Sequence, residues 1–137
     1  MRYFDTSAFL KLIVAEDHSL ELREAMTGAD LWSSVLLDVE AHRAARRLGV
    51  SADAVSQALE AVALITLGDD TVRNARSIGT DSLRALDALH LATALELGDD
   101  LEAVVTYDRR LAAGVADEGV TVESPGLPPR WWVDAPS

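Results

Sequence analysis

The segment AVVTYDRRL, residues 103–111, decides the fold class because it joins a strand pattern to a helix pattern at one aspartate. An apolar, β-branched run ends at Tyr107, Asp108 follows, and Arg109 begins a helical pattern. The start of the chain repeats this order, since Arg2-Tyr3-Phe4 precedes Asp5 and TSAFL follows it. If these strands are parallel, both carboxylates lie at the same edge of the sheet, where open α/β folds hold their ligands.

The apolar spacing along the whole chain predicts strands that alternate with helices. We interpret Asp87 as the end of a third strand-like run that opens a helix, and Glu40 as a residue inside a helix. Such alternation predicts an α/β fold with a central parallel sheet of four or five short strands flanked by helices. The expected strands lie near 2–4, 30–33, 64–67, 103–107 and 120–122, and the expected helices span 6–15, 17–27, 35–48, 52–63, 70–78, 87–97 and 109–117.

Length and composition indicate one folded domain. The 137 residues are 49% hydrophobic, include no cysteine, and contain no apolar run long enough to span a membrane. No signal-peptide pattern begins the chain, so we expect a cytoplasmic protein. We expect the domain over 1–123 and a Pro/Trp-rich tail over 124–137, because the prolines after Ser124 cannot continue a helix or a central strand. We expect Trp131 and Trp132 to dock on the domain's own surface, with a partner's surface as the alternative.

The net charge of −11, from 12 basic and 23 acidic residues, disfavours a polyanionic partner at first sight. However, arginines crowd the four acids singled out above, whereas many other acids occur in pairs elsewhere. A basic rim around an acidic pocket is able to bind a phosphate backbone with strong salt dependence. The candidate residues of this rim, which would bind the phosphate backbone of a nucleic acid, are Arg43, Arg46, Arg47, Arg109 and Arg110.

Glu40 is informative because helix capping cannot explain a carboxylate in mid-helix. Leu36, Leu37 and Ala44 lie beside it at helical spacing, whereas Asp38 faces the other way, toward solvent. A carboxylate on an apolar stripe needs a cation or a proton. The plainer alternative is an ion pair with Arg43 or Arg47 on the same face.

Aspartate at a helix start also has a plain explanation, because it caps free backbone amides. Capping alone leaves unexplained why several such acids would converge. Converging carboxylates repel one another unless a hard cation lies between them, and oxygen ligands favour Mg²⁺, with Mn²⁺ as a substitute, over Zn²⁺. His90 follows Asp87 by three residues and either reaches the edge of this pocket or only orients its helix, and His18 and His42 have a surface pattern.

The order DTSAF at 5–9, a glutamate at 40, LDALHLATA at 86–94 and VVTYDRRL at 104–111 resembles the PIN-domain ribonucleases, and more narrowly the VapC toxins of VapBC toxin–antitoxin pairs. The resemblance runs from Met1 to about Val122 and implies a PIN-like three-layer fold. It also implies RNA as the substrate, growth inhibition by RNA cleavage, a VapB-like antitoxin partner and a homodimer.

The resulting hypothesis is a metal-dependent endoribonuclease. Its catalytic and metal-binding residues are Asp5, Glu40, Asp87 and Asp108, with Asp5 and Asp87 as the principal ligands. Thr6, Ser7 and Thr106 are auxiliary hydroxyls. A haloacid-dehalogenase-like phosphatase is disfavoured because Ser7 stands where that motif needs a second aspartate. A non-catalytic PIN-like binding domain, in which the acids are only caps, is the remaining alternative.

Overall fold

The computed structural model describes residues 1–133 and shows strands and helices in alternation. The strands are β1 Arg2–Phe4, β2 Leu31–Ser34, β3 Ala63–Ile65, β4 Ala103–Val105 and β5 Val122–Glu123. The helices are α1 Thr6–Ile13, α2 Ser19–Ala25, α3 Leu36–Arg47, α4 Ala52–Leu59, α5 Asp69–Ala75, α6 Ala85–Leu95 and α7 Arg109–Asp117, with a 3₁₀ turn, η1, at Gly98–Asp100.

The strands within residues 1–133 form one parallel, five-stranded sheet in the order β3-β2-β1-β4-β5. Tyr3 of β1 pairs with Trp32 on one side and with Val104 on the other. Because all neighbouring strands are parallel, their carboxyl ends lie at one edge of the sheet. The predicted α/β class and parallel sheet are therefore confirmed.

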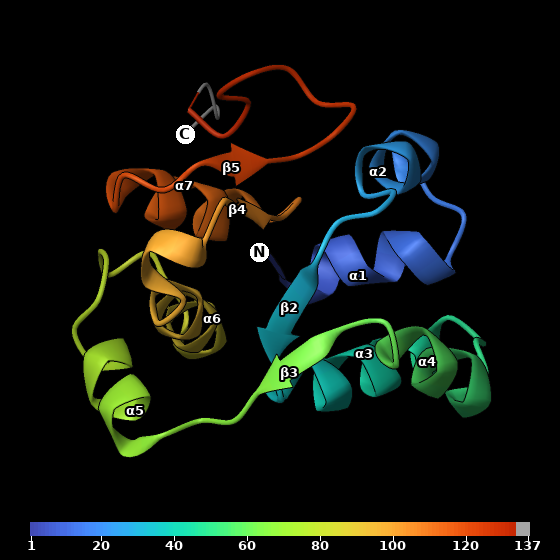
Figure 1. Cartoon of the computed structure of the whole chain (residues 1–137), viewed down its shortest axis with the longest axis horizontal. Helices are drawn as coiled ribbons and strands as arrows, with labels where there is room; N and C mark the ends of the chain where they lie inside the picture. The colour runs from blue at the N-terminus through green and yellow to red at the C-terminus, as the bar shows by residue number, and fades with distance from the viewer. Residues whose placement is uncertain (134–137) are drawn as a thin grey trace.

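Helices cover both faces of the sheet and make three layers. Figure 1 shows α3 and α4 on one side of β2 and β3, with α6 on the other side. Adjacent residues of β1 point into different layers, as expected for a strand. Tyr3 packs with Leu91 of α6 and Leu111 of α7, whereas Phe4 packs with Leu22 of α2.

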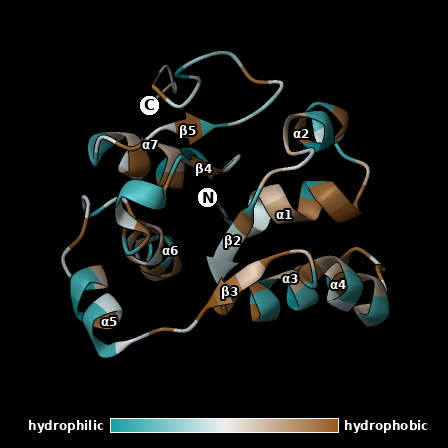
Figure 2. Cartoon of the chain, in the orientation of Figure 1, coloured by the Kyte–Doolittle hydropathy of each residue, from teal (hydrophilic) through white to brown (hydrophobic). Residues whose placement is uncertain are grey.

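Apolar residues of several helices pack together in the core. Phe9 of α1, Leu37 of α3 and Val55 of α4 are fully buried in one apolar cluster. Figure 2 shows α1 as largely hydrophobic, whereas α5 is mostly hydrophilic. The strongly apolar α1 is consistent with a position between α2, α3 and α4, all of which it contacts. Among the described residues, no helix is both long and apolar enough to cross a bilayer.

The interpretation of Asp87 as the end of a strand-like run is wrong. No strand ends at Asp87, because residues 80–84 form a turn and α6 begins at Ala85, two residues earlier than expected. Leu83, the apolar residue in this turn, packs with Ile78 against the cluster around Leu91 and Leu111. Several helices also end earlier than predicted, for example α4 at Leu59 rather than 63, because β3 begins at Ala63.

The described part of the carboxyl-terminal segment, residues 124–133, lies against the domain. The Ser124 hydroxyl donates to the Thr106 carbonyl at 2.5 Å, and the Tyr107 hydroxyl donates to the Pro125 carbonyl at 2.7 Å. Trp131 and Trp132 are half-buried and line a hollow together with Val122 and other residues of the domain. Docking on the domain's own surface is thus confirmed for both tryptophans, while 134–137 of the predicted tail lie outside the described residues.

Candidate functional site

Asp5 is a buried carboxylate at the junction of β1 and α1. It is 5% exposed, and its Oδ1 accepts from the Ala8 amide at 3.0 Å, so it does cap α1. The Ser7 hydroxyl donates to the same carboxylate at 2.7 Å, and the Thr106 hydroxyl donates to Oδ2 at 2.6 Å. Burial raises the pKa of Asp5 above its ordinary value, although these hydrogen bonds oppose the shift.

Ser7 and Thr106 also tie the carboxyl ends of β1 and β4 together. The Ser7 hydroxyl accepts from the Tyr107 amide at 2.9 Å, and the Thr106 hydroxyl accepts from the Asp108 amide at 3.0 Å. Asp108 in turn caps α7, because its Oδ1 accepts from the Leu111 amide at 3.0 Å. Asp5 and Asp108 therefore lie at the same edge of the sheet. The Ser7 and Thr106 hydroxyls bond to both strand ends there.

Asp87 reaches this edge from α6. Because α6 leads through η1 into the start of β4, its first turn must lie at the carboxyl end of the parallel sheet. Burial raises the pKa of half-buried Asp87, and the like charge of Asp108 raises it further. The Arg84 backbone amide, which donates to Asp87 at 3.3 Å, opposes that shift.

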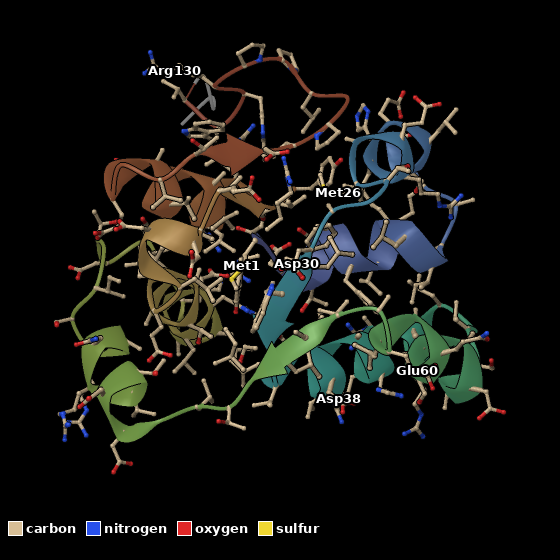
Figure 3. The ribbon with its side chains drawn as sticks, viewed as in Figure 1. Met1, Met26, Asp30, Asp38, Glu60 and Arg130 are labelled. Carbon is tan, nitrogen blue, oxygen red and sulfur yellow. The ribbon has the colours of Figure 1, made fainter. Side chains whose placement is uncertain are left out.

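Glu40 of α3 is bonded to a histidine, so the predicted alternative of an arginine partner is wrong. The Nε2 atom of His90 lies 2.6 Å from Glu40 Oε1, and the Nδ1 atom of the same ring lies 2.7 Å from the Tyr3 hydroxyl. Within residues 1–133, no ion pair joins Glu40 to an arginine. Figure 3 labels Asp38 on the outer side of α3, where it is exposed as predicted.

The acids thus share one end of the sheet without forming a closed cage. Asp5 lies with Ser7 and Thr106, Asp87 lies near Asp108, and His90 links Glu40 to Tyr3. In the part of the chain that the structure describes, no three acidic or histidine side chains are grouped closely enough to hold one ion. The donor set nevertheless fits a hard cation, because it offers carboxylate and hydroxyl oxygens and two carboxyls whose pKa is raised.

The fold and this arrangement of acids agree with a comparison against known families, in which the PIN domain matches residues 2–115. The chain belongs to the PIN-domain family. Among curated proteins it is similar to Ribonuclease VapC47 of Mycobacterium tuberculosis, with 37% identity over 133 residues that cover 92% of this chain and 98% of the relative. Ribonuclease VapC46 of the same organism is 38% identical over 125 residues, which cover 90% and 96%.

A solved structure described as a toxin–antitoxin complex from Klebsiella pneumoniae has the same fold. The TM-score is 0.67, and the match covers 91% of this chain and 98% of that chain. The sequence identity is 20%, so this likeness concerns the fold alone. The relatives above place the chain among PIN domains of the VapC type.

The remaining predicted residues of this PIN domain are the auxiliary Thr6 and the five candidate RNA-binding arginines. Thr6 Oγ1 is buried without a hydrogen-bond partner in residues 1–133, so it does not support Asp5 as Ser7 and Thr106 do. The predicted RNA-binding arginines are all exposed. Arg43, Arg46 and Arg47 line one hollow on α3, and Arg109 and Arg110 begin α7 directly after Asp108.

Sequence reasoning did not find the role of Tyr3 in this PIN domain and left that of His90 open. Tyr3 contacts His90 across 87 positions of sequence, and His90 contacts Glu40 across 50. Helical and strand periodicity describe only neighbours along one element, so neither pattern predicts these contacts. The one signal was a histidine on the apolar side of α6, one turn after Asp87.

Proposed function

We propose that this PIN domain is a Mg²⁺-dependent endoribonuclease and the toxin of a toxin–antitoxin pair, which inhibits growth by cleaving RNA. The observation that carries the proposal is the approach of Asp87 to Asp108 at the edge where Asp5 is buried, with a raised pKa at Asp5 and Asp87. Carboxylates held this way are stabilised by a hard divalent cation. The relatives named Ribonuclease VapC supply RNA as the substrate class.

The residues have separate tasks in this proposal. Asp5 and Asp87 are the principal ligands of Mg²⁺ or Mn²⁺, and Glu40 and Asp108 complete the set directly or through water. A bound ion supplies Lewis-acid chemistry, which lowers the pKa of water and neutralises charge at a phosphodiester. The Ser7 and Thr106 hydroxyls hold the Asp5 carboxylate in place through the bonds described above.

The proposed partners are an RNA substrate and a VapB-like antitoxin, which the names of the relatives and of the solved toxin–antitoxin complex support. The proposal also includes a second copy of the chain and a cytoplasmic location. The domain spans 1–123, and 124–137 form an appended tail. The exposed arginines of α3 and of the start of α7 form the rim that contacts the RNA backbone.

A non-catalytic PIN-like binding domain is the second candidate, because Asp5 and Asp108 both cap helices. Asp5→Asn separates the two functions, since asparagine caps nearly as well as aspartate. We expect the wild-type protein to cleave RNA with Mg²⁺ and to stop when EDTA is added. Asp5→Asn should lower the cleavage rate by at least about 100-fold, the upper range seen for weakened metal sites.

Asp38→Asn is the matched control, because it makes the same chemical change at an exposed aspartate. It should cleave RNA like the wild-type protein. Purified wild-type protein, free of any bound inhibitor, that cleaves no RNA with Mg²⁺ or Mn²⁺ would favour the binding domain. Full activity in Asp5→Asn would point to a contaminating nuclease or another site.

A further inference from the structure

Three side chains from three separate elements form one continuous hydrogen-bonded chain. Tyr3 of β1 is fully buried, His90 of α6 is 3% exposed, and the Glu40 side chain of α3 is 23% exposed. The Tyr3 hydroxyl is hydrogen-bonded to His90 Nδ1 at 2.7 Å, and the Glu40 carboxylate is hydrogen-bonded to His90 Nε2 at 2.6 Å. The Tyr3 and His90 rings also meet edge-on, with 70° between their planes.

For a neutral His90 ring, the chemistry of these groups determines where the hydrogens lie. A carboxylate oxygen only accepts hydrogen bonds, so the His90 Nε2 atom carries the hydrogen of its bond to Glu40. In a neutral imidazole the Nδ1 atom then accepts, which makes the Tyr3 hydroxyl the donor to it. Each end of the buried ring is thus held, and the ring cannot turn over without breaking both bonds.

This arrangement fixes a side chain that its own helix leaves free. Glutamate has three side-chain torsions, and α3 lies on the opposite side of the sheet from α6. The bond to His90 joins the two helices and anchors Oε1, while Oε2 has no hydrogen-bond partner within residues 1–133. His90 follows Asp87 by one helical turn. Helix α6 therefore both carries Asp87 and orients Glu40.

We propose that His90, held by Tyr3, is a positioning residue that orients Glu40 and leaves its second oxygen, Oε2, free for the ion that Asp5 and Asp87 would hold. The proposal rests on the metal-dependent function above and deepens it. His90 does not touch the ion or the substrate. It acts through Glu40, as histidines and carboxylates outside a ligand set commonly act on the ligands.

Two substitutions of His90 test this role. Glutamine and asparagine both carry a side-chain amide and differ in how far it reaches. The side-chain amide of glutamine reaches about as far as His90 Nε2, so His90→Gln keeps a donor for Glu40. The amide of asparagine reaches only the position of Nδ1, so His90→Asn contacts Tyr3 but not Glu40. We expect His90→Asn to weaken Mn²⁺ binding by about 10–100-fold in titration calorimetry. His90→Gln should bind Mn²⁺ with an affinity closer to that of the wild-type protein.

A double substitution tests whether the effect passes through Glu40. In a Glu40→Gln background, His90→Asn should cause no further loss of Mn²⁺ affinity, because coupled residues are not additive. A merely structural role predicts instead that the two losses add. Equal Mn²⁺ affinities for His90→Gln and His90→Asn would overturn the proposal. If His90→Asn does not fold, Tyr3→Phe, which lacks one oxygen atom, takes its place, and an unchanged affinity there would overturn it too.

Different results contradict the ribonuclease function and the positioning role of His90. Wild-type protein that binds Mn²⁺ but cleaves no RNA contradicts the ribonuclease function and leaves the positioning test to be decided by the affinities. Wild-type protein that cleaves RNA while all His90 variants bind Mn²⁺ equally well contradicts the positioning role alone. Wild-type protein that binds no Mn²⁺ contradicts both.

Discussion

At the scale of single residues, Asp5 has two structural roles that are usually kept apart. It caps α1 through the Ala8 amide, and it is a buried carboxylate with a raised pKa. A cap needs only an oxygen that accepts, whereas an ion ligand needs the negative charge. The charge on Asp5 is therefore not required for the helix and is unfavourable in the metal-free fold.

This separation predicts the stability of two variants in the absence of metal. Asp5→Ala removes the cap and should lower the free energy of unfolding by about 0.5–2 kcal/mol. Asp5→Asn keeps an accepting oxygen and removes the buried charge, so it should be at least as stable as the wild-type protein. Urea unfolding in EDTA measures both. Equal destabilisation of the two variants would show that the charge itself holds the junction of β1 and α1.

At the scale of elements, the sequence predicts what depends on neighbours along the chain. The strands predicted at 2–4 and 103–107, the second of which ends at Val105, and the aspartates that follow them could be predicted because apolar runs and caps are local patterns. The interpretation of Asp87 as the end of a strand-like run is wrong because residues 80–84 form a turn, in which the apolar Leu83 packs into the core without joining the sheet. The bond from His90 to Glu40 joins two layers and has no local signature.

Helix α3 carries a prediction of its own through its exposed arginines. Neutralising Arg46 and Arg47 by substitution with glutamine should reduce the slope of log K against log salt by about 1.4 if each contacts one phosphate of single-stranded RNA. Binding is measured with the Asp5→Asn protein, so that the RNA stays intact. The residual affinity should also fall at every salt concentration.

Arg73 and Arg76 provide the matched control, since both are exposed and lie in or just after α5. Their double substitution changes the net charge equally and should leave the slope unchanged. If both pairs lower the slope alike, the effect belongs to net charge and the RNA does not bind along α3.

At the scale of the whole molecule, the raised pKa values of Asp5 and Asp87 couple folding to pH and, in the proposed function, to cations. The ordinary value for both carboxyls is 3.8, so above it the folded state holds protons that the unfolded state has released. The metal-free protein therefore loses this part of its stability as pH rises from about 4 through the raised values. A bound cation offsets the loss, because it favours the ionised carboxylates.

The increase in melting temperature caused by Mg²⁺ should consequently be small at pH 4 and grow toward neutral pH. Differential scanning calorimetry at matched ionic strength measures it, with NaCl in place of MgCl₂ as the control. Asp5→Asn combined with Asp87→Asn should remove the pH dependence of the Mg²⁺ effect. A Mg²⁺ effect that is the same at pH 4 and pH 7 would contradict the assignment of the ion to these carboxylates.

The pairing of β1 with β4 has a consequence for the time at which the site can form. The bond between Thr106 and Asp5 spans 101 positions of sequence, and β4 must insert beside β1 before β5 can join the sheet. A nascent chain emerging at about 5–20 residues per second carries Asp5 out of the ribosome several seconds before Thr106. During synthesis the Asp5 carboxylate has only the neighbouring Ser7 hydroxyl to hold it, and the edge with both hydroxyls cannot assemble before Thr106 has emerged.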